Sequence, residues 1–216
     1  MSTTEQLYQI ADELRAVAAM GLRFGTNGYD TERYEHVMRA SARLVAAVES
    51  RSPDEIYTQF RDDLLHLSPL AGVEIAVFHA SRLLLVQRRD DKLWALPGGL
   101  CEVGETLAQA AERELEEEAG IRGRATQLLG VFDSRLWQTR TKVHLYSAMF
   151  LVESEDQPMA RVGPRNSTGP KSETLDAGFF EENTLPELSQ GHHIRVPTAF
   201  KIHRGEILAP YFDKVL

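Results

Sequence analysis

The sequence has little of what marks a secreted, membrane-bound or nucleic-acid-coating protein. It has one cysteine, Cys101, so no intrachain disulfide can form. No apolar run reaches the roughly 18 residues that a membrane helix needs, and M-S-T-T-E-Q at 1–6 lacks the basic and apolar regions of a signal peptide. The net charge is −8 and there is no basic patch, so charge does not support RNA as a partner. We therefore expect a cytoplasmic protein that does not bind membranes.

The chain is instead rich in carboxylates over one short segment. Five glutamates occur within seven residues, at 112, 114, 116, 117 and 118. Glu114, Glu117 and Glu118 are spaced so that a helix would place them on one face. The run also ends just before Gly120, at a helix C-terminus, where the macrodipole disfavours anions. Most charge runs are solvated surfaces, but divalent cations would neutralise this face, and oxygen ligands favour Mg²⁺ or Mn²⁺.

The order of residues around these glutamates favours the metal interpretation. Gly99, Glu105 and the run R-E-L-E-E-E-A-G-I at 113–121 resemble the Nudix hydrolase box at every defined position. The resemblance implies an enzyme that hydrolyses a nucleoside diphosphate linked to another group X. It also implies that the metal ligands are the carbonyl of Gly98 and the carboxylates of Glu114, Glu117 and Glu118.

Two further charged residues complete the predicted catalytic set. Arg113 is one of them, and we expect it to pair with Glu105 and to orient the loop rather than to take part in the chemistry. The other is Glu173, which the resemblance favours as a fourth metal ligand or general base outside the box. Asp176 is its rival, and a solvated loop glutamate is an equally good interpretation of Glu173. If Glu173 is not the base, Glu114 is the next choice.

Four residues are candidates for binding the substrate. His144 interrupts an apolar strand, Trp94 could stack on a base, and Arg88 and Arg135 could hold phosphates. Each of them has an ordinary alternative, because aromatic residues more often belong to the core and arginines to the surface. The other aromatic candidates for stacking, with the same alternative, are Phe132, Trp137 and Tyr146.

Helical periodicity fills the first part of the chain. Apolar residues recur at helical spacing from Leu7, and Gly21 is the predicted end of this first helix. Asp30 is expected to cap a second helix. A capping box at Ser52–Glu55 opens a third. These helices predict a small all-helical N-terminal domain at 1–68, suited to packing, dimerisation or covering an active site.

From Gly72 the apolar period changes to that of strands. Strands are predicted on both sides of the glutamate-rich helix, whose expected buried face is Leu107, Ala110, Ala111 and Leu115. The segment 153–172 is predicted to be a long loop, and Pro197 is expected to break the region 191–204 into short pieces. Strands flanking a central helix indicate an α+β fold. The resemblance implies the Nudix α/β/α sandwich with a mixed sheet, in a domain at 70–216.

The layout of the whole chain resembles a bacterial Nudix subgroup with an N-terminal helical domain. This resemblance implies a homodimer that hydrolyses X-linked nucleoside diphosphates, with CDP-choline or a similar compound as the first candidate. ADP-ribose or an RNA end is the alternative substrate, although ADP-ribose enzymes carry a proline after the box and this chain has none between Pro97 and Pro158. A third interpretation is a nucleotide sensor without activity, which the complete set of box carboxylates argues against.

Overall fold

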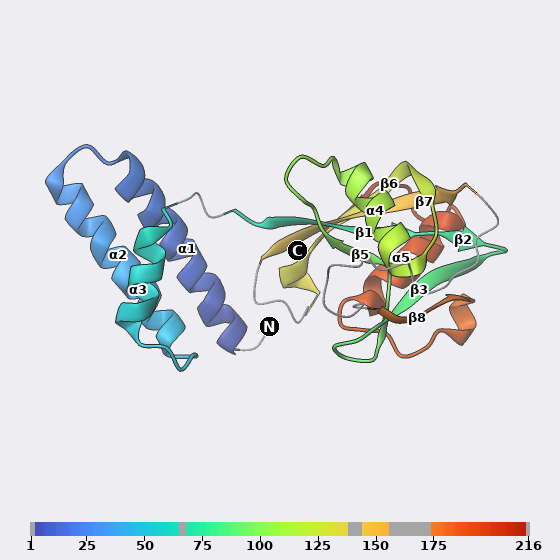
Figure 1. The fold of residues 1–216 in the computed structure, drawn as a ribbon, viewed down its shortest axis with the longest axis horizontal. Helices are drawn as coiled ribbons and strands as arrows, with labels where there is room; N and C mark the ends of the chain where they lie inside the picture. Colours follow the sequence, from blue (N-terminus) through green and yellow to red (C-terminus); the bar gives the residue numbers. More distant parts are fainter. Residues whose placement is uncertain (1–2, 65–67, 138–143, 156–173, 215–216) are drawn as a thin grey trace. The chain divides into compact units, whose positions relative to one another are not determined.

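The computed structural model describes residues 3–64, 68–137, 144–155 and 174–214. The chain divides into two compact units (Figure 1): an N-terminal unit that ends at Pro69 and also takes in His144, and a C-terminal unit that begins at Leu70. Within the described residues, no helix is both long and apolar enough to span a bilayer.

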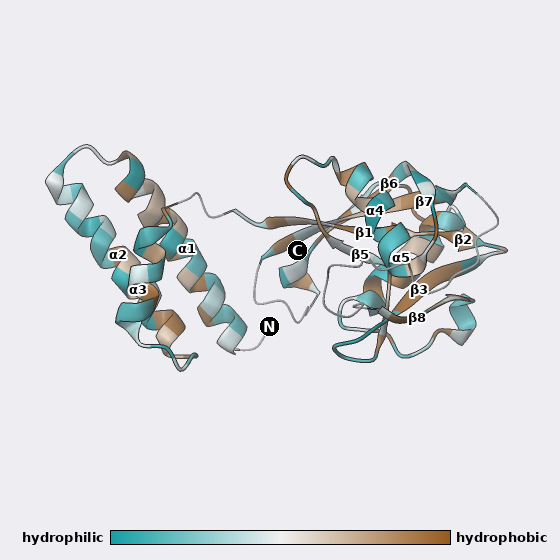
Figure 2. Cartoon of the chain, in the orientation of Figure 1, coloured by the Kyte–Doolittle hydropathy of each residue, from teal (hydrophilic) through white to brown (hydrophobic). Residues whose placement is uncertain are grey.

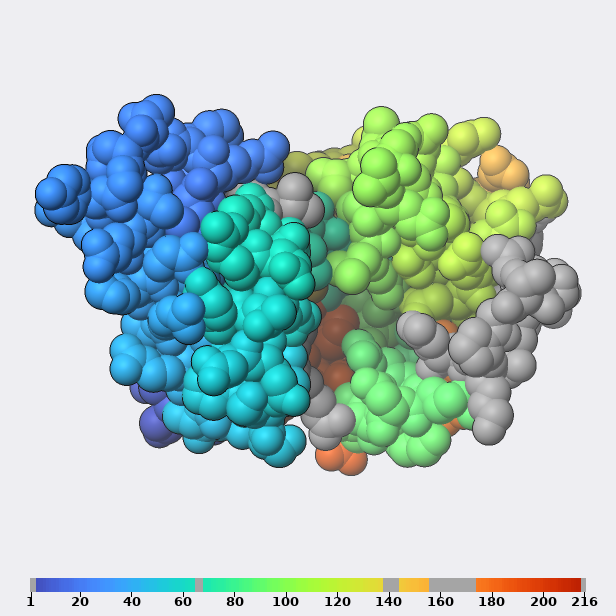
Figure 3. All heavy atoms as spheres, turned by 60° about the vertical axis from the view of Figure 1, so that its left-hand side comes forward, coloured from blue at the N-terminus to red at the C-terminus, as the bar shows by residue number. Residues whose placement is uncertain are grey.

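The N-terminal unit consists of three helices, α1 (Thr3–Phe24), α2 (Gly28–Ala46) and α3 (Pro53–Asp62). One side of each helix enters a shared core that contains Ala11, Met38 and Ile56, all fully buried. The Ser41 hydroxyl donates a hydrogen bond to the Ala11 carbonyl at 2.7 Å and so ties α2 to α1. In Figure 3 the blue and cyan spheres of α2 and α3 form a continuous surface of this unit.

The capping box at Ser52 is confirmed, but two predicted helix ends are wrong. The first helix continues past Gly21 to Phe24. Gly21 instead allows Tyr34 of α2 to approach closely, since a Cβ there would lie 2.4 Å from the Tyr34 ring. The second helix is capped by Asn27, whose side chain accepts the Asp30 N–H at 2.9 Å. Asp30 therefore lies inside the first turn.

The C-terminal unit is built from nine strands and two α-helices within the described residues. The strands are β1 (Leu70–Ala76), β2 (Phe78–His79), β3 (Arg82–Arg88), β4 (Trp94–Ala95), β5 (Gly98–Leu100), β6 (Gly123–Asp133), β7 (Leu145–Ser154), β8 (Thr174–Phe180) and β9 (Tyr211–Phe212); the helices are α4 (Leu107–Ala119) and α5 (His192–His203), with short 3-10 turns at Ser134–Leu136 and Glu182–Thr184. One sheet has the order β5-β1-β7-β6-β9, and a second joins β2, β4 and β8 to β3.

The first sheet is mixed, the strand pairs of the second are all antiparallel, and a helix packs on each side. In the first sheet, β1 is antiparallel to β5 and parallel to β7. Alternate residues of β1 face opposite sides: Val73 and Ile75 pack in one core cluster with Leu115 of α4, and Ala76 packs in another with Val196 of α5. Figure 2 shows apolar residues, in brown, along β3, which contributes to both clusters. The predicted α+β fold, with a mixed sheet, helices packed on it and a preceding helical region, is confirmed.

Two predictions for helices of this unit are wrong. Leu107 is 40% exposed, whereas the other three residues of the predicted buried face of α4 are fully buried. Pro197 does not break the chain but lies inside α5. The proline lacks an N–H, so the helix loses only the hydrogen bond to the carbonyl oxygen of His193. His193 is an exposed residue in the first turn. The predicted loop at 153–172 lies almost wholly outside the described residues.

Candidate active site

The glutamate-rich segment forms α4, and the sequence defines both of its ends. Thr106 is the N-cap and shares a capping box with Gln109. Gly120 ends the helix with a φ of 64°, a left-handed conformation that favours glycine. Between these ends, Ala110, Ala111 and Leu115 enter the core. The opposite side, which carries the carboxylates, is thereby directed away from the core, and Figure 3 shows the light-green residues of this region at the molecular surface.

Two of the carboxylates lie against the backbone of β5. The Gly98 N–H donates a hydrogen bond to Glu118 Oε2 at 2.9 Å. A Cβ on Gly99 would lie 2.3 Å from Glu114 Oε1, so only glycine leaves that carboxylate its place. On the other side of the strand, a Cβ on Gly98 would lie 2.2 Å from the Val73 carbonyl oxygen. The two glycines therefore let β5 fit tightly between β1 and the carboxylate face of α4.

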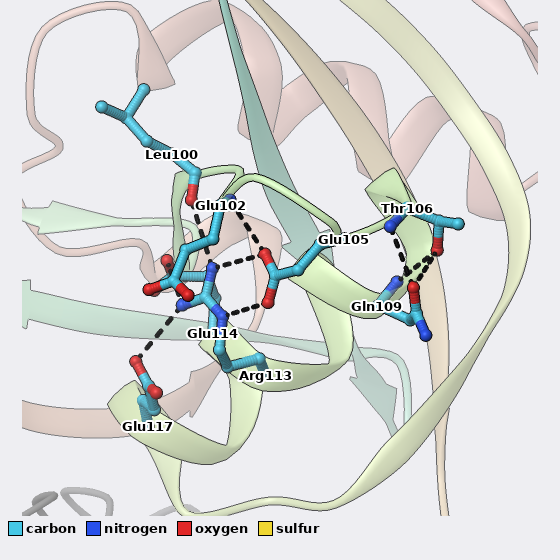
Figure 4. A network of polar contacts seen from close by, with 8 residues as sticks. All are labelled: Leu100, Glu102, Glu105, Thr106, Gln109, Arg113, Glu114 and Glu117. Atoms are coloured by element: carbon cyan, nitrogen blue, oxygen red, sulfur yellow. Dashed lines mark hydrogen bonds and ion pairs between the residues drawn. The ribbon is translucent and has the colours of Figure 1, made fainter.

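Arg113 links the loop to this face, as Figure 4 shows. Its guanidinium holds both oxygens of Glu105, with Nε to Oε1 at 2.6 Å and Nη2 to Oε2 at 3.0 Å. The predicted ion pair is thus present. Nη1 also contacts Glu114 Oε1 at 2.8 Å and Glu117 Oε2 at 3.3 Å. The hydrogen bond from Arg113, helped by the Glu102 N–H, lowers the pKa of Glu105 to about 2, so this carboxylate is charged at physiological pH.

The remaining glutamates of the run differ from these in their surroundings. Glu112 accepts the Ala125 N–H at 3.1 Å and pairs with Arg124 at 3.2 Å, so it fastens α4 to β6. Glu116 is exposed. The run of five therefore separates into one residue that holds the sheet, one solvated residue, and the set Glu114, Glu117 and Glu118 next to the glycines and Arg113.

Three of the four predicted substrate residues lie in the C-terminal unit, where Arg88 and Trp94 belong to the paired strands β3 and β4 and Arg135 follows β6. Arg88, at the end of β3, pairs with Asp90 at 2.9 Å, and Glu118 is among the charges that raise its pKa, so it lies within electrostatic range of the carboxylate face. Trp94 packs edge-on against Phe180 at 4.7 Å between ring centroids. Arg135 pairs with Asp133 at 2.6 Å, beyond the end of β6.

Two predicted residues are not placed at the carboxylate face by the structure. His144 groups with the N-terminal unit rather than with the sheet that follows it. Glu173 lies outside the described residues. Its rival Asp176 is an exposed residue of β8 whose Oδ1 accepts the Ala177 N–H at 2.8 Å. The fourth carboxylate stays a prediction.

The chemistry of the carboxylate face fits a divalent cation. Among the residues that the structure describes, no three acidic, imidazole or thiol groups already converge on one point where an ion could be held. Arg113 instead supplies the positive charge next to Glu114 and Glu117. The donor set is nevertheless oxygen only, as Mg²⁺ and Mn²⁺ prefer, and the missing side chains of Gly98 and Gly99 let the backbone of β5 lie directly against it.

Comparison with known families shows to which family the chain belongs. A family model described as "NUDIX domain" matches residues 69–197, more than half of the chain. The protein belongs to the Nudix family. A second model, described as "UDP-X-like, N-terminal oligomerisation domain", matches residues 5–60. The Nudix protein is thus a hydrolase, a pyrophosphatase of nucleoside diphosphate derivatives, from a family that generally uses divalent ions such as Mg²⁺.

Individual relatives of the Nudix protein carry two kinds of name. It is 34% identical over 179 residues to the Bacillus subtilis (strain 168) protein named "Putative ADP-ribose pyrophosphatase YjhB", with 83% of this chain and 82% of that protein covered. A crystal structure of an ADP-ribose pyrophosphatase from Streptococcus suis 89-1591 matches with 27% identity and a TM-score of 0.56, over 68% of this chain and all of that one. A UDP-X diphosphatase structure matches 98% of this chain and all of its own with a TM-score of 0.58, and at 23% identity it supports the fold alone.

Three residues near the box escaped the sequence analysis. Glu74 of β1 and Arg195 of α5 form a buried ion pair, and His192 at the start of α5 accepts the Leu96 N–H. Glu74 was detectable as a single charge inside the apolar run V-E-I-A-V. The two residues of α5 were not, because the expected break at Pro197 hid their spacing of one helical turn.

Proposed function

We propose that the protein hydrolyses the diphosphate bond of a nucleoside diphosphate linked to X in a Mg²⁺-dependent reaction, and releases a nucleoside monophosphate and X-phosphate. The observation that carries the proposal is the contact between the carboxylate face of α4 and β5. Glu118 accepts the Gly98 N–H, and Glu114 lies beside Gly99. One strand of backbone and one helix face thereby enclose an oxygen-rich position next to which a diphosphate could lie.

Each residue of the site has a defined part in this proposal. Bound divalent ions neutralise the diphosphate and lower the pKa of the attacking water. Glu114, Glu117 and Glu118, with the Gly98 carbonyl, would hold them, and Glu173 would supply a fourth carboxylate as ligand or base. Arg113 holds the box loop to α4 through Glu105 and keeps Glu114 in place. Most of the catalytic effect in such phosphoryl chemistry comes from positioning and charge.

Among the predicted substrate residues, Arg88 is the one that we favour for a phosphate contact. It is half-exposed, and it lies within electrostatic range of Glu118. The contacts of Trp94 with Phe180 and of Arg135 with Asp133 favour packing and structural roles for these two residues. His144, which immediately precedes β7, stays a candidate for the base of the nucleotide.

CDP-choline is the first candidate substrate, because the chain layout resembles the Nudix subgroup with an N-terminal helical domain, and residues 5–60 match the UDP-X-like domain. ADP-ribose is the second, and it is favoured by the names of two relatives, the B. subtilis protein and a Methanocaldococcus jannaschii ADP-ribose pyrophosphatase that is 31% identical over 131 residues. The missing proline after the box argues against ADP-ribose.

A substrate panel tests the proposal. The full chain is incubated with Mg²⁺ and, separately, with CDP-choline, ADP-ribose, nucleotide sugars and short RNA, and the phosphate-containing products are separated by chromatography. We expect a nucleoside monophosphate from CDP-choline, and none when EDTA replaces Mg²⁺. Faster hydrolysis of ADP-ribose would favour the second candidate. No Mg²⁺-dependent turnover of any compound would contradict the proposal.

We further propose that the protein is a homodimer joined through its helical domain, residues 1–68, which precedes the Nudix domain at 70–216. The N-terminal match to an oligomerisation domain supports this. On α1, Ile10, Val17 and Phe24 are spaced by seven residues, or two turns, and are 46%, 59% and 64% exposed. Such an exposed apolar stripe is typical of a helix–helix interface.

Val17→Glu is expected to separate the dimer, because it puts a charge into the centre of this stripe. Light scattering on a sizing column should then give the mass of one chain, 24.3 kDa, where the unmodified protein gives twice that mass. Ser50→Glu is the control, since Ser50 is exposed outside α1. A Val17→Glu variant with the dimer mass would exclude this stripe as the interface.

A further inference from the structure

The segment that leads into the Nudix box is held at three successive residues. The Leu96 N–H donates to His192 Nδ1 at 3.2 Å. The Pro97 carbonyl accepts the Ile75 N–H at 2.9 Å, and the Gly98 N–H donates to Glu118 at 2.9 Å. These bonds come from α5, β1 and α4, which lie on different sides of the segment. The position of Gly98 is thus determined by all three elements.

His192 is built into this position. Residues 187–189 run beside β4, where the Trp94 N–H donates to the Glu187 carbonyl at 3.0 Å and the Ser189 N–H donates to the Trp94 carbonyl at 2.8 Å. α5 begins directly afterwards, which brings His192 next to Leu96. His192 is 5% exposed. Burial, together with the nearby charges of Arg195 and Arg88, lowers the pKa of His192 well below 6.5, so Nδ1 is free to accept a hydrogen bond.

A buried ion pair fixes α5 one turn further along. Arg195 Nη1 donates to Glu74 Oε1, and the two residues are 5% and 6% exposed. Glu74 lies directly opposite Gly98 in the pairing of β1 with β5. A buried pair of this kind often adds no net stability compared with apolar side chains. Its presence therefore favours a role in setting the position of α5 against the strand that neighbours Gly98.

From these contacts we infer that His192 is a positioning residue for the metal site, a role that rests on the proposed function. The Nδ1 atom of His192 holds the Leu96–Gly98 segment so that the Gly98 carbonyl stays beside the carboxylate face of α4. The Glu74–Arg195 pair keeps α5 in a fixed position relative to that segment. His192 contacts neither substrate nor metal in this scheme. It acts through two peptide units, in the way that residues behind metal ligands generally set the orientation of those ligands.

Mn²⁺ binding tests this role without relying on turnover. Free Mn²⁺ is measured by electron paramagnetic resonance during titration of the full chain. His192→Phe keeps a buried ring without an acceptor, and we expect it to raise the Mn²⁺ dissociation constant by about tenfold. His192→Asn places an oxygen where Nδ1 lies, and it is expected to bind Mn²⁺ nearly as the unmodified chain does. If the Phe variant does not fold, His192→Ala takes its place.

Thr198→Val is the matched control. Thr198 is a buried residue of the same helix, and its hydroxyl donates to the Ile194 carbonyl at 2.8 Å, away from the box. Its loss should lower the melting temperature but leave Mn²⁺ affinity unchanged. The inference is overturned if His192→Phe binds Mn²⁺ with the affinity of the unmodified chain, or if His192→Asn binds Mn²⁺ as weakly as His192→Phe does. It is also overturned if Thr198→Val weakens Mn²⁺ binding as much as His192→Phe does. An unmodified chain that binds no Mn²⁺ would contradict the proposed function itself and, with it, this inference.

Discussion

Glu118→Gln should reduce Mg²⁺-dependent hydrolysis by about a hundredfold or more, because a carboxylate proposed to hold the divalent ion is replaced by a neutral amide, which is a weaker ligand. The glutamine keeps the shape of the side chain, and its oxygen can still accept the Gly98 N–H that Glu118 accepts at 2.9 Å. The fold should therefore survive, and the loss should report the missing negative charge. Initial rates with saturating Mg²⁺, on whichever panel compound is hydrolysed, measure the effect.

Glu116→Gln is the matched control for this experiment. It makes the same charge change two residues away on α4, at an exposed position, and should leave the rate unchanged. Glu173→Gln forms a second arm: an equally large loss would support Glu173 as the fourth carboxylate, whereas a normal rate would remove it from the site. Normal hydrolysis by the Glu118→Gln variant would refute the assignment of the carboxylate face.

Alanine at the two box glycines should have two different outcomes. In Gly98→Ala the new methyl group would lie 2.2 Å from the Val73 carbonyl oxygen and 3.1 Å from the Glu74 Cα. Both are backbone atoms of β1 that cannot move without disturbing the β1–β5 pairing, so the melting temperature should fall by about 5 °C or more. In Gly99→Ala the three atoms nearest to the methyl group all belong to the Glu114 carboxylate, the end of a flexible side chain that can rotate away. Its melting temperature should stay near that of the unmodified chain.

The Gly99→Ala variant should nevertheless lose most of its activity, because the carboxylate that moves is a predicted metal ligand. Thermal unfolding and kcat/KM, measured on both variants, separate the two effects. Equal melting temperatures for the two variants would show that β5 can move away from β1. Full activity of Gly99→Ala would show that catalysis does not depend on the position of the Glu114 carboxylate.

Local pattern was enough to predict the elements that carry the box. The apolar spacing of α4 and its terminal Gly120 depend on residues close in sequence, so helix and box could be recognised together. The capping box at Ser52 was predictable for the same reason. Leu107 was misjudged because helical periodicity marks a face but does not say where the tertiary core ends, and Leu107 lies in the first turn, beyond the cover of the sheet.

Long-range packing decided the points that local pattern missed. In the sequence, Gly21 is typical of a helix end. Only the structure shows that it is a glycine because the Tyr34 ring of the neighbouring helix packs against it. In the sequence, Pro197 predicts a break in the helix. In the structure it removes only one helical hydrogen bond, in the first turn of α5. The Glu74–Arg195 pair joins residues far apart in the chain, so no spacing rule could reveal it. The substrate side of the site depends on such contacts, and for this reason the box alone predicts the reaction better than the substrate.

The pairing of β1 also has a consequence for how the chain folds. Leu70 pairs with Leu145 and Ala76 with Leu151, so one edge of β1 stays open until β7 has been synthesised. By contrast, α1 packs on α2 and α2 on α3, so these two pairings join elements that are adjacent in sequence. Folding rates fall as contacts become more distant in sequence, so we expect the helical unit to form early on the ribosome and the sheet to close late. Until then the free edge of β1 is the part of the chain most open to pairing with other chains.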